Sequence, residues 1–236
     1  MNVFQTLQTV MGQSVLSPWR APVSILSGQV GDELELTWAE QQALPWLTSS
    51  GMALSAGKHG NLWDASKVAF DYEMPVSQWI QAFKYQARIE RGRLLADLFA
   101  QRFQLHSLVS QFPNEAVEVL LPVPIHRKRY RQRGFNQSLR LAKRLSKLSG
   151  IPVENRALLR VRNTPPQASL SAHQRQTNLT DAFALQADYL QNYRRIAVVD
   201  DVLTTGATMN ALLAKIREQT NVEWVEVWAI AHTQMD

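Results

Sequence analysis

The stretch Arg195-Ile-Ala-Val-Val-Asp-Asp-Val-Leu-Thr-Thr-Gly-Ala-Thr-Met209 gives the strongest indication of the fold. Its apolar run, Ile196–Val199, is bounded by polar residues and ends in two carboxylates, which is typical of a buried parallel strand. Hydroxyl side chains around one glycine follow. Apolar residues then recur at helical spacing, at Met209, Leu212, Leu213 and Ile216. The stretch therefore predicts a strand, a short loop and a helix.

The loop between this strand and helix has the chemistry of a phosphate site. A glycine lets the backbone turn and approach a ligand, threonines offer hydroxyl donors, and the first amides of a helix favour an anion. The candidate phosphate-binding residues are Thr204, Thr205, Gly206, Ala207 and Thr208. Asp200 and Asp201, at the end of the strand, suit ribose hydroxyls or a hard cation. A mere helix cap would need only one aspartate and no run of hydroxyls.

This pattern resembles the signature of the type I phosphoribosyltransferases, which bind 5-phosphoribosyl-1-pyrophosphate. Their motif has four apolar residues, two acids and a Thr/Ser-Thr-Gly-x-Thr loop, and Ile196–Thr208 matches it without a gap. The resemblance implies that Asp200 and Asp201 are the catalytic acids that hold the ribose and a magnesium ion. It also implies that Thr204–Thr208 holds the 5′-phosphate.

Composition limits the class of protein. The chain has 236 residues, 45% of them apolar, which is enough for one large domain or two small ones. It has no cysteine, so disulfides and zinc–thiolate sites are excluded. We see neither an apolar run long enough for a membrane span nor a secretory signal, and we expect a soluble cytoplasmic protein.

The positive charge is concentrated in one part of the chain. Residues 119–180 contain 13 Lys and Arg and one acid, whereas residues 1–118 contain 8 Lys and Arg and 11 acids. Five of the cations lie in Arg127–Arg133, directly after the predicted strand Val117–Pro124, where ligands of open α/β sheets bind. A solvated connector is one interpretation of this run. The other is a site for pyrophosphate or nucleic acid, with candidate residues Arg127, Arg129, Arg133 and Asn136.

Strands and helices alternate along the rest of the chain. We expect strands near Val68–Tyr72 and Val222–Ala231, and helices that begin near Pro75 and Leu139. Gly92 predicts a break before a second helix. Lys84 and Arg88 lie one turn apart, and we expect them on a solvated face, with a ligand-facing role as the alternative. The alternation predicts an α/β fold with a doubly wound parallel sheet.

Residues 1–66 show no sustained periodicity and carry four tryptophans, Trp19, Trp38, Trp46 and Trp63. They predict a small irregular N-terminal module, followed by a phosphoribosyltransferase-like domain over residues 67–236. Such a small module usually needs a disulfide or a structural metal for stability, and we expect its tryptophans to form its core.

Four landmarks together are similar to the ComF family, which is linked to competence and to the uptake and use of DNA. They are Pro122-Val-Pro124 with the basic run, Arg133-Gly-Phe-Asn-Gln137, the loop that ends in Arg175-x-x-Asn-Leu-x-x-Ala-Phe183, and Asp200–Thr208. The resemblance covers roughly residues 68–234. It implies a Mg²⁺-dependent transfer to an unidentified nitrogen acceptor, with the loop at 160–181 closing over the site. The alternative is a non-catalytic protein that senses phosphoribosyl pyrophosphate or binds single-stranded DNA, with DNA-uptake proteins as further partners. The oligomeric state stays open.

ComF proteins usually begin with a zinc-ribbon-like module built from C-x-x-C pairs. Here Ser14-x-x-Ser17, Leu47-x-x-Ser50 and Ala56-x-x-His59 occupy about those places. A lone histidine does not hold structural zinc, which takes about four ligands. We therefore expect a degenerate module without metal.

Overall fold

The computed structural model describes residues 23–29, 31, 35–47, 60–106, 116–163 and 181–233. Contacts divide the chain into two units, Met1–Ala43 and Leu44–Asp236. This division falls earlier than the predicted boundary near residue 66, and Leu44–Asp64 belongs to the larger unit.

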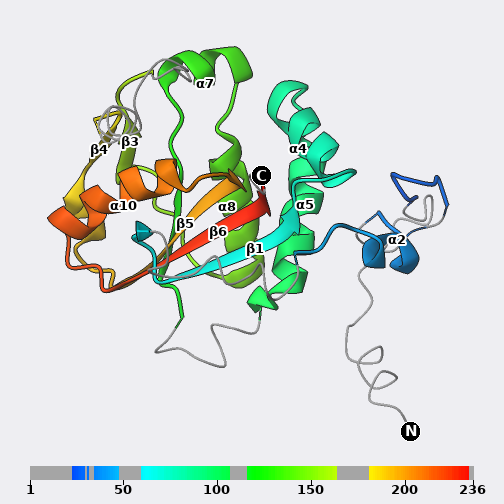
Figure 1. The fold of residues 1–236 in the computed structure, drawn as a ribbon, viewed down its shortest axis with the longest axis horizontal. Helices are drawn as coiled ribbons and strands as arrows, with labels where there is room; N and C mark the ends of the chain where they lie inside the picture. Colours follow the sequence, from blue (N-terminus) through cyan, green and yellow to red (C-terminus); the bar gives the residue numbers. More distant parts are fainter. Residues whose placement is uncertain are drawn as a thin grey trace, which may run out of the picture. The chain divides into compact units, whose positions relative to one another are not determined.

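The larger unit is built on a parallel sheet of four strands (Figure 1). These are β1 (Ala65–Asp71), β2 (Val119–Pro122), β5 (Arg195–Leu203) and β6 (Trp224–His232), in the order β1-β6-β5-β2. The strand predicted to be central, β5, lies between β6 and β2 and pairs in parallel with both. The carboxyl ends of all four strands therefore lie at one edge of the sheet.

Helices cover both faces of the sheet, which confirms the predicted fold class (Figure 1). On one face lie α4 (Val76–Tyr85), α5 (Ile89–Arg102) and α8 (Gln137–Ser149). On the other face α10 (Ala207–Gln219) packs its apolar side on Ile196 and Val198 of β5. An antiparallel pair of strands, β3 (Leu158–Arg160) and β4 (Phe183–Leu185), and the 3-10 helix η2 (Ala187–Leu190) contribute to the same core. In the described ranges, no helix combines the length and the apolar character needed to cross a membrane.

The prediction of a helix break at Gly92 is wrong. The break lies at residues 86–88, and Gly92 is inside α5. A Cβ atom at Gly92 would lie 2.6 Å from the Phe83 ring of α4. The glycine therefore allows the two helices to approach closely, at a modest cost in helix propensity.

The basic run Arg127–Arg133 forms a helix of its own, α7, between His126 and Gly134. None of its residues is buried, so the run lacks the apolar periodicity by which amphipathic helices are predicted. In Figure 1, α7 stands at the top, clear of the sheet.

In the smaller unit, α2 (Trp38–Gln42) begins with a capping box between Thr37 and Glu40. Glu40 also accepts hydrogen bonds from the hydroxyl of Ser24, at 2.6 and 2.8 Å. The hydrogen bonds that the Glu40 carboxylate accepts lower its pKa to about 2, and the bond from Ser24 has the largest effect. The contribution of this carboxylate to stability is therefore present above pH ~4.5 and is lost as the pH falls towards 2.

Three of the four N-terminal tryptophans contradict the expectation of a tryptophan core within residues 1–66. Trp46 stacks on Phe70 of β1, with ring centroids 4.4 Å apart, and Trp63 lies in the core of the larger unit. Trp38 is 74% exposed. Trp19, His59 and most of the positions compared with C-x-x-C pairs lie outside the described residues. The zinc-ribbon-like outline without metal therefore stays a prediction.

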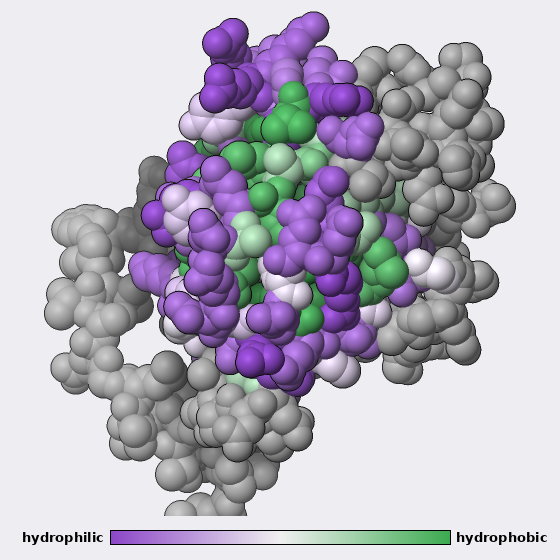
Figure 2. Space-filling view, turned by 90° about the vertical axis from the view of Figure 1, so that its left-hand side faces the viewer, coloured by the Kyte–Doolittle hydropathy of each residue, from purple (hydrophilic) through white to green (hydrophobic). Residues whose placement is uncertain are grey.

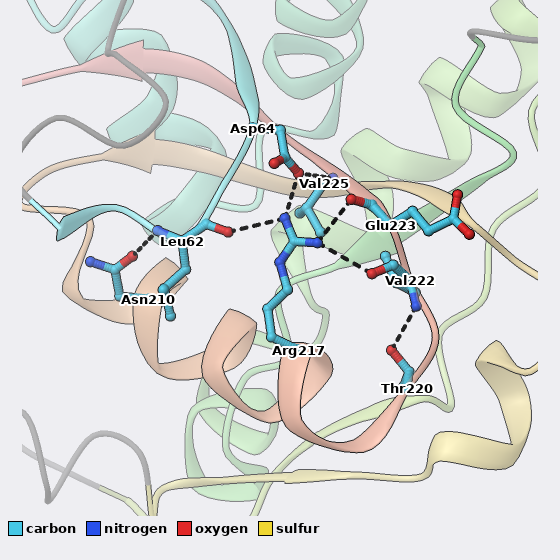
Figure 3. Close-up of polar contacts among 8 residues, drawn as sticks. All are labelled: Leu62, Asp64, Asn210, Arg217, Thr220, Val222, Glu223 and Val225. Carbon is cyan, nitrogen blue, oxygen red and sulfur yellow. Dashed lines mark hydrogen bonds and ion pairs between the residues drawn. The ribbon is translucent and has the colours of Figure 1, made fainter.

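The segment that precedes β1 is fixed to α10 and β6 (Figure 3). Asp64 accepts hydrogen bonds from the guanidinium of Arg217 and from the amide of Val225, the latter at 2.7 Å. The amide of Leu62 donates to Asn210 Oδ1 at 3.0 Å. Arg217 also donates to the carbonyls of Val222 and Glu223, at 3.2 and 3.1 Å. These bonds hold Trp63 beside the first turn of α10.

Candidate functional site at the carboxyl edge of the sheet

Two helices of one face of the sheet hold the twin acids at the end of β5. Asp200 Oδ1 accepts hydrogen bonds from Ser138 Oγ at 2.8 Å and from the amide of Asp201 at 2.9 Å. Asp201 Oδ1 lies 2.7 Å from Lys84 Nζ at the end of α4. Asp201 is only 4% exposed. Each acid is thus fixed by a side chain distant in the sequence.

The negative charges of the two neighbouring carboxylates oppose each other. Burial, and then the charge of Asp201, raises the pKa of Asp200 to about 7, although Lys84 and Ser138 act in the opposite direction. Asp201 Oδ2 is buried and has no hydrogen-bond partner among the described residues. A buried carboxylate oxygen of this kind is costly unless a ligand supplies a donor or a cation. The two carboxylates can therefore accept hydrogen bonds from ribose hydroxyls or bind a cation.

The predicted phosphate loop is accessible. The side chains of Thr204 and Thr205 are exposed, Ala207 and Thr208 are half-buried, and Gly206 caps α10 with a φ of 73°. The amide of Ala207 donates to Thr205 Oγ1 at 3.2 Å. The backbone of Gly206 is buried against Trp63, and a Cβ atom there would lie 2.7 Å from Cη2 of that indole. Glycine is thus required both by the backbone angle and by the tryptophan.

We expect Gly206→Ala to destabilise the protein more than Gly150→Ala. Both glycines have a positive φ, 73° and 79°, but a Cβ atom at Gly150 would meet nothing within 4 Å. The backbone strain should cost about 1–2 kcal/mol at either position. The contact with Trp63 should add a further ~1–3 kcal/mol at Gly206. Urea unfolding of the two variants measures this difference. Equal losses would contradict the role given to Trp63.

The candidate arginines lie on two sides of α7. Arg129 and Arg133 line a pocket of about 440 Å³ together with Lys84 and Tyr85. Arg133 donates to Gln137 Oε1 at 2.6 Å and lies over the ring of Tyr85, 5.2 Å from its centroid. Arg127 lines a different pocket. The pocket with Arg129 and Arg133 is therefore a cationic pocket that also contacts Asp201 through Lys84.

Asn136 joins α8 to the end of β2. Its side-chain oxygen accepts from the amides of Ser138 and Leu139, at 3.0 and 3.3 Å, and its nitrogen donates to the carbonyl of Val123 at 3.0 Å. These bonds use both polar atoms of the amide. The geometry therefore supports a role for Asn136 in placing Ser138, which in turn holds Asp200.

A scan against models of protein families finds no match. The chain is 36% identical over 170 residues to Competence protein F of Haemophilus influenzae, across 72% of this chain and 73% of the relative. The chain belongs to the ComF family. It is also 33% identical over 173 and 174 residues to the DNA utilization protein YhgH of Salmonella typhimurium and of Escherichia coli K12. Both of those matches cover 72% of this chain and 73% of the relative.

Lys84 of this ComF-family site takes the alternative of the two roles that its sequence allows, because it faces Asp201 and not solvent, and its spacing of four from the buried Ile80 is the signal for it. Two further residues of the site do not emerge from the sequence. Ser138 carries no signal of its own. Arg160 is half-buried over the ring of Phe183, at 5.1 Å from the ring centroid to Cζ. Burial and then the charge of Arg129 lower the pKa of Arg160, and Asp200 opposes this.

The acids of this ComF-family chain fit a magnesium ion only in part. No group of three or more His, Cys, Asp or Glu side chains suited to a metal occurs among the residues that the structure describes. Mg²⁺ is often bound through one or two carboxylates, with water and substrate phosphates as the other ligands. Asp200 and Asp201 can supply such carboxylates, since one oxygen of Asp201 is buried without a partner among the described residues.

Proposed function

We propose that this ComF-family protein binds 5-phosphoribosyl-1-pyrophosphate at the carboxyl edge of its sheet and transfers the phosphoribosyl group to a nitrogen acceptor. One observation carries the proposal. An exposed hydroxyl- and glycine-containing loop follows at the end of β5, and two neighbouring acids near that end are held between a lysine and a serine. This arrangement brings an anion site and a site for sugar hydroxyls within the reach of one small molecule.

Each part of the substrate has a matching group in this assignment. Thr204–Thr208 and the first amides of α10 bind the 5′-phosphate. Asp200 and Asp201 accept hydrogen bonds from the ribose hydroxyls. The pyrophosphate lies in the cationic pocket, where Arg129 and Arg133 match its oxygens and Lys84 adds charge.

The proposed step exchanges one bond at C1 of the ribose for another. The lone pair of the acceptor nitrogen forms the new C–N bond, the C1–O bond breaks, and pyrophosphate leaves with the electron pair. The acceptor nitrogen then loses its proton to water. Positive charge builds on the ring as the C1–O bond lengthens, and the carboxylates of Asp200 and Asp201 stabilise it. A magnesium ion, when bound, would neutralise charge on the leaving pyrophosphate.

Two measurements on the full chain test the proposal. Calorimetric titration with phosphoribosyl pyrophosphate, with and without Mg²⁺, should show saturable binding that adenosine monophosphate does not reproduce. Pyrophosphate release should then follow with at least one member of a panel of bases and amines. Absence of binding overturns the proposal. Binding without turnover on any acceptor favours a sensing role for the same site.

A second candidate function is the binding of single-stranded DNA by α7. The helix presents Arg127, Lys128 and Arg131 to solvent, and Tyr130 and Tyr85 are exposed beside it. Phe135 is buried and packs on Phe83, with ring centroids 5.4 Å apart, so it offers no stacking surface. Cations next to exposed aromatic rings are the usual means of binding single strands. The two relatives named DNA utilization protein YhgH support this candidate.

This candidate predicts a particular dependence on salt. Replacing Arg127, Lys128 and Arg131 with Gln should weaken binding of oligothymidylate and reduce the slope of log K against log salt by about 0.7 per charge removed. Arg93 of α5 and Lys215 of α10 provide control positions, where the same change should leave the slope nearly unaltered. Fluorescence anisotropy over a range of salt concentrations measures the slope. An equal change of slope in the α7 variants and the control variants would show that DNA is held by the general positive charge of the protein. That result would contradict a site on α7.

A further inference from the structure

The basic helix α7 depends on its two ends for stability. It has seven residues, none of them buried, and five of the seven are Lys or Arg. Figure 2 shows hydrophilic side chains at the top of the molecule, the end at which α7 stands in Figure 1. A helix this short forms poorly by itself, and helices in proteins usually gain their stability from packing. Because α7 buries no side chain, the groups that bond its end turns carry more weight.

Contacts outside the helix fix its last turn. Gly134 ends α7 with a φ of 80°, and its amide donates to the carbonyl of Tyr130 at 2.7 Å. Arg133 donates to Gln137 Oε1 at 2.6 Å and lies over the ring of Tyr85, 5.2 Å from the ring centroid. The last turn of α7 is therefore joined to both α8 and α4.

The first turn of α7 is capped by a histidine. The amide of Lys128 donates to His126 Nδ1 at 3.2 Å, which is the bond that a cap residue makes to the second residue of a helix. This turn contains no acid, and the cations of Arg127, Lys128 and Arg129 oppose the helix dipole there. The imidazole therefore offsets part of an unfavourable arrangement of charge.

The capping bond requires an unprotonated Nδ1. A neutral imidazole accepts at one nitrogen, whereas both nitrogens of the protonated ring are donors. Histidine is the side chain that ordinarily changes charge between about pH 5 and 8. The titratable groups around His126 are Arg127, Lys128 and Tyr130 of α7 and Arg160 of β3, while α8 contributes uncharged residues. The hollow of about 470 Å³ that His126 lines has no carboxylate among its described residues, so none of them balances a proton on the imidazole.

We infer that His126 is a positioning residue, which holds the first turn of α7 in place when it is neutral and releases that turn, with Arg129, when it is protonated. Arg129 is the third residue of α7 and lines the cationic pocket. The protein should therefore hold a polyanion less well in acid, through a side chain that touches no ligand in the proposed assignment. The loosening of α7 goes beyond the proposed function, and its effect on phosphoribosyl pyrophosphate rests on that function.

His126→Asn tests the inference, because asparagine is among the best cap residues and does not titrate. His106→Asn is the matched control, since it removes an exposed histidine outside α7. The Cα chemical shifts of residues 127–130, measured by NMR on the full chain at pH ~7.5 and pH ~5.5, report whether the first turn is helical. Calorimetric titration with inorganic pyrophosphate under the same two conditions reports on the cationic pocket. The protonation of the ligand itself cancels when two proteins are compared at one pH.

In the wild type and in His106→Asn, the Cα shifts of the first turn should move towards unfolded values as the pH falls. In His126→Asn they should stay helical. The pyrophosphate affinity of the wild type relative to His126→Asn should fall about threefold to tenfold over the same interval, which is within what the loss of a helix cap allows.

Two results overturn the inference as a whole: Cα shifts that stay constant in the wild type, and shifts that change equally in His126→Asn. An affinity ratio that stays constant while the shifts change overturns the part that concerns Arg129. Failure of the wild type to bind either pyrophosphate or phosphoribosyl pyrophosphate at the higher pH refutes the proposed function instead, and the shifts of α7 still decide whether His126 controls the helix.

Discussion

Asp200→Asn is expected to weaken the binding of phosphoribosyl pyrophosphate about tenfold to a hundredfold while making the folded protein more stable at neutral pH. The loss of affinity follows from removing a charged acceptor of ribose hydrogen bonds. The gain in stability follows because burial and Asp201 disfavour the charge of Asp200. An amide of the same shape keeps an oxygen that accepts from Ser138 Oγ. Calorimetry and thermal unfolding measure the two effects.

The change in stability should depend on pH with a definite sign. The pKa of Asp200 is raised from an ordinary 3.8 to about 7 in the folded protein, so the unfolded chain releases this proton at a lower pH. The wild type should therefore lose stability as the pH rises from ~4 to ~7, and Asp200→Asn should lack this part of the decline. Asp188→Asn, at an exposed acid of η2, is the control and should follow the wild type. A variant that is less stable than wild type at pH 7 would show that the charge of Asp200 supports the fold.

Lys84→Met should give the largest loss of stability, about 3–5 kcal/mol, because it leaves the carboxylate of Asp201 buried without its cation. The methionine keeps the volume and the apolar stem of the lysine. Arg156→Met breaks the Glu154–Arg156 pair, whose arginine is exposed, and should cost at most ~1 kcal/mol. Urea unfolding of both variants compares the buried pair with the exposed one.

The double variant Lys84→Met/Asp201→Asn separates charge from packing. Removing the unpaired charge should recover more than half of the loss, because a neutral amide is cheaper to bury than a carboxylate. If the double variant were as unstable as Lys84→Met, the loss would come from packing of the methionine against its neighbours. The ion pair would then have no special importance.

The parts of the fold that sequence reasoning found are those encoded locally. The strand β5, which contains the twin acids, and the helix α10 are separated by only a short loop, and the pattern of this one stretch predicts both elements and the acids. Lys84 and Ser138 reach the acids from α4 and α8, and only the packing of these helices brings them there. Their roles depend on distances that no local spacing contains.

The two glycines show why the same residue type was interpreted correctly at one place and wrongly at another. At Gly206 the turn between β5 and α10 requires a positive φ, and the local sequence indicates this turn, although it does not indicate the contact with Trp63. At Gly92 the reason for glycine is the ring of Phe83 on the preceding helix. Similarly, α7 was not predicted as a helix, because a helix with no buried residue has no apolar stripe.

Hydrogen bonds fix Leu62 and Asp64 to α10 and β6. A shortened protein that contains only the larger unit should therefore need these residues to fold stably. A shortened chain that starts at β1 would lack Trp63 and Asp64. Without the Trp63 indole, an empty space would remain beside Gly206. Without Asp64, the guanidinium of Arg217 would lose its carboxylate partner. A chain that starts at Leu44 keeps both, together with Trp46 on Phe70. Trp63 and Asp64, just ahead of the first strand, are thus part of the phosphate loop's support, although neither of them contacts the ligand in the proposed assignment.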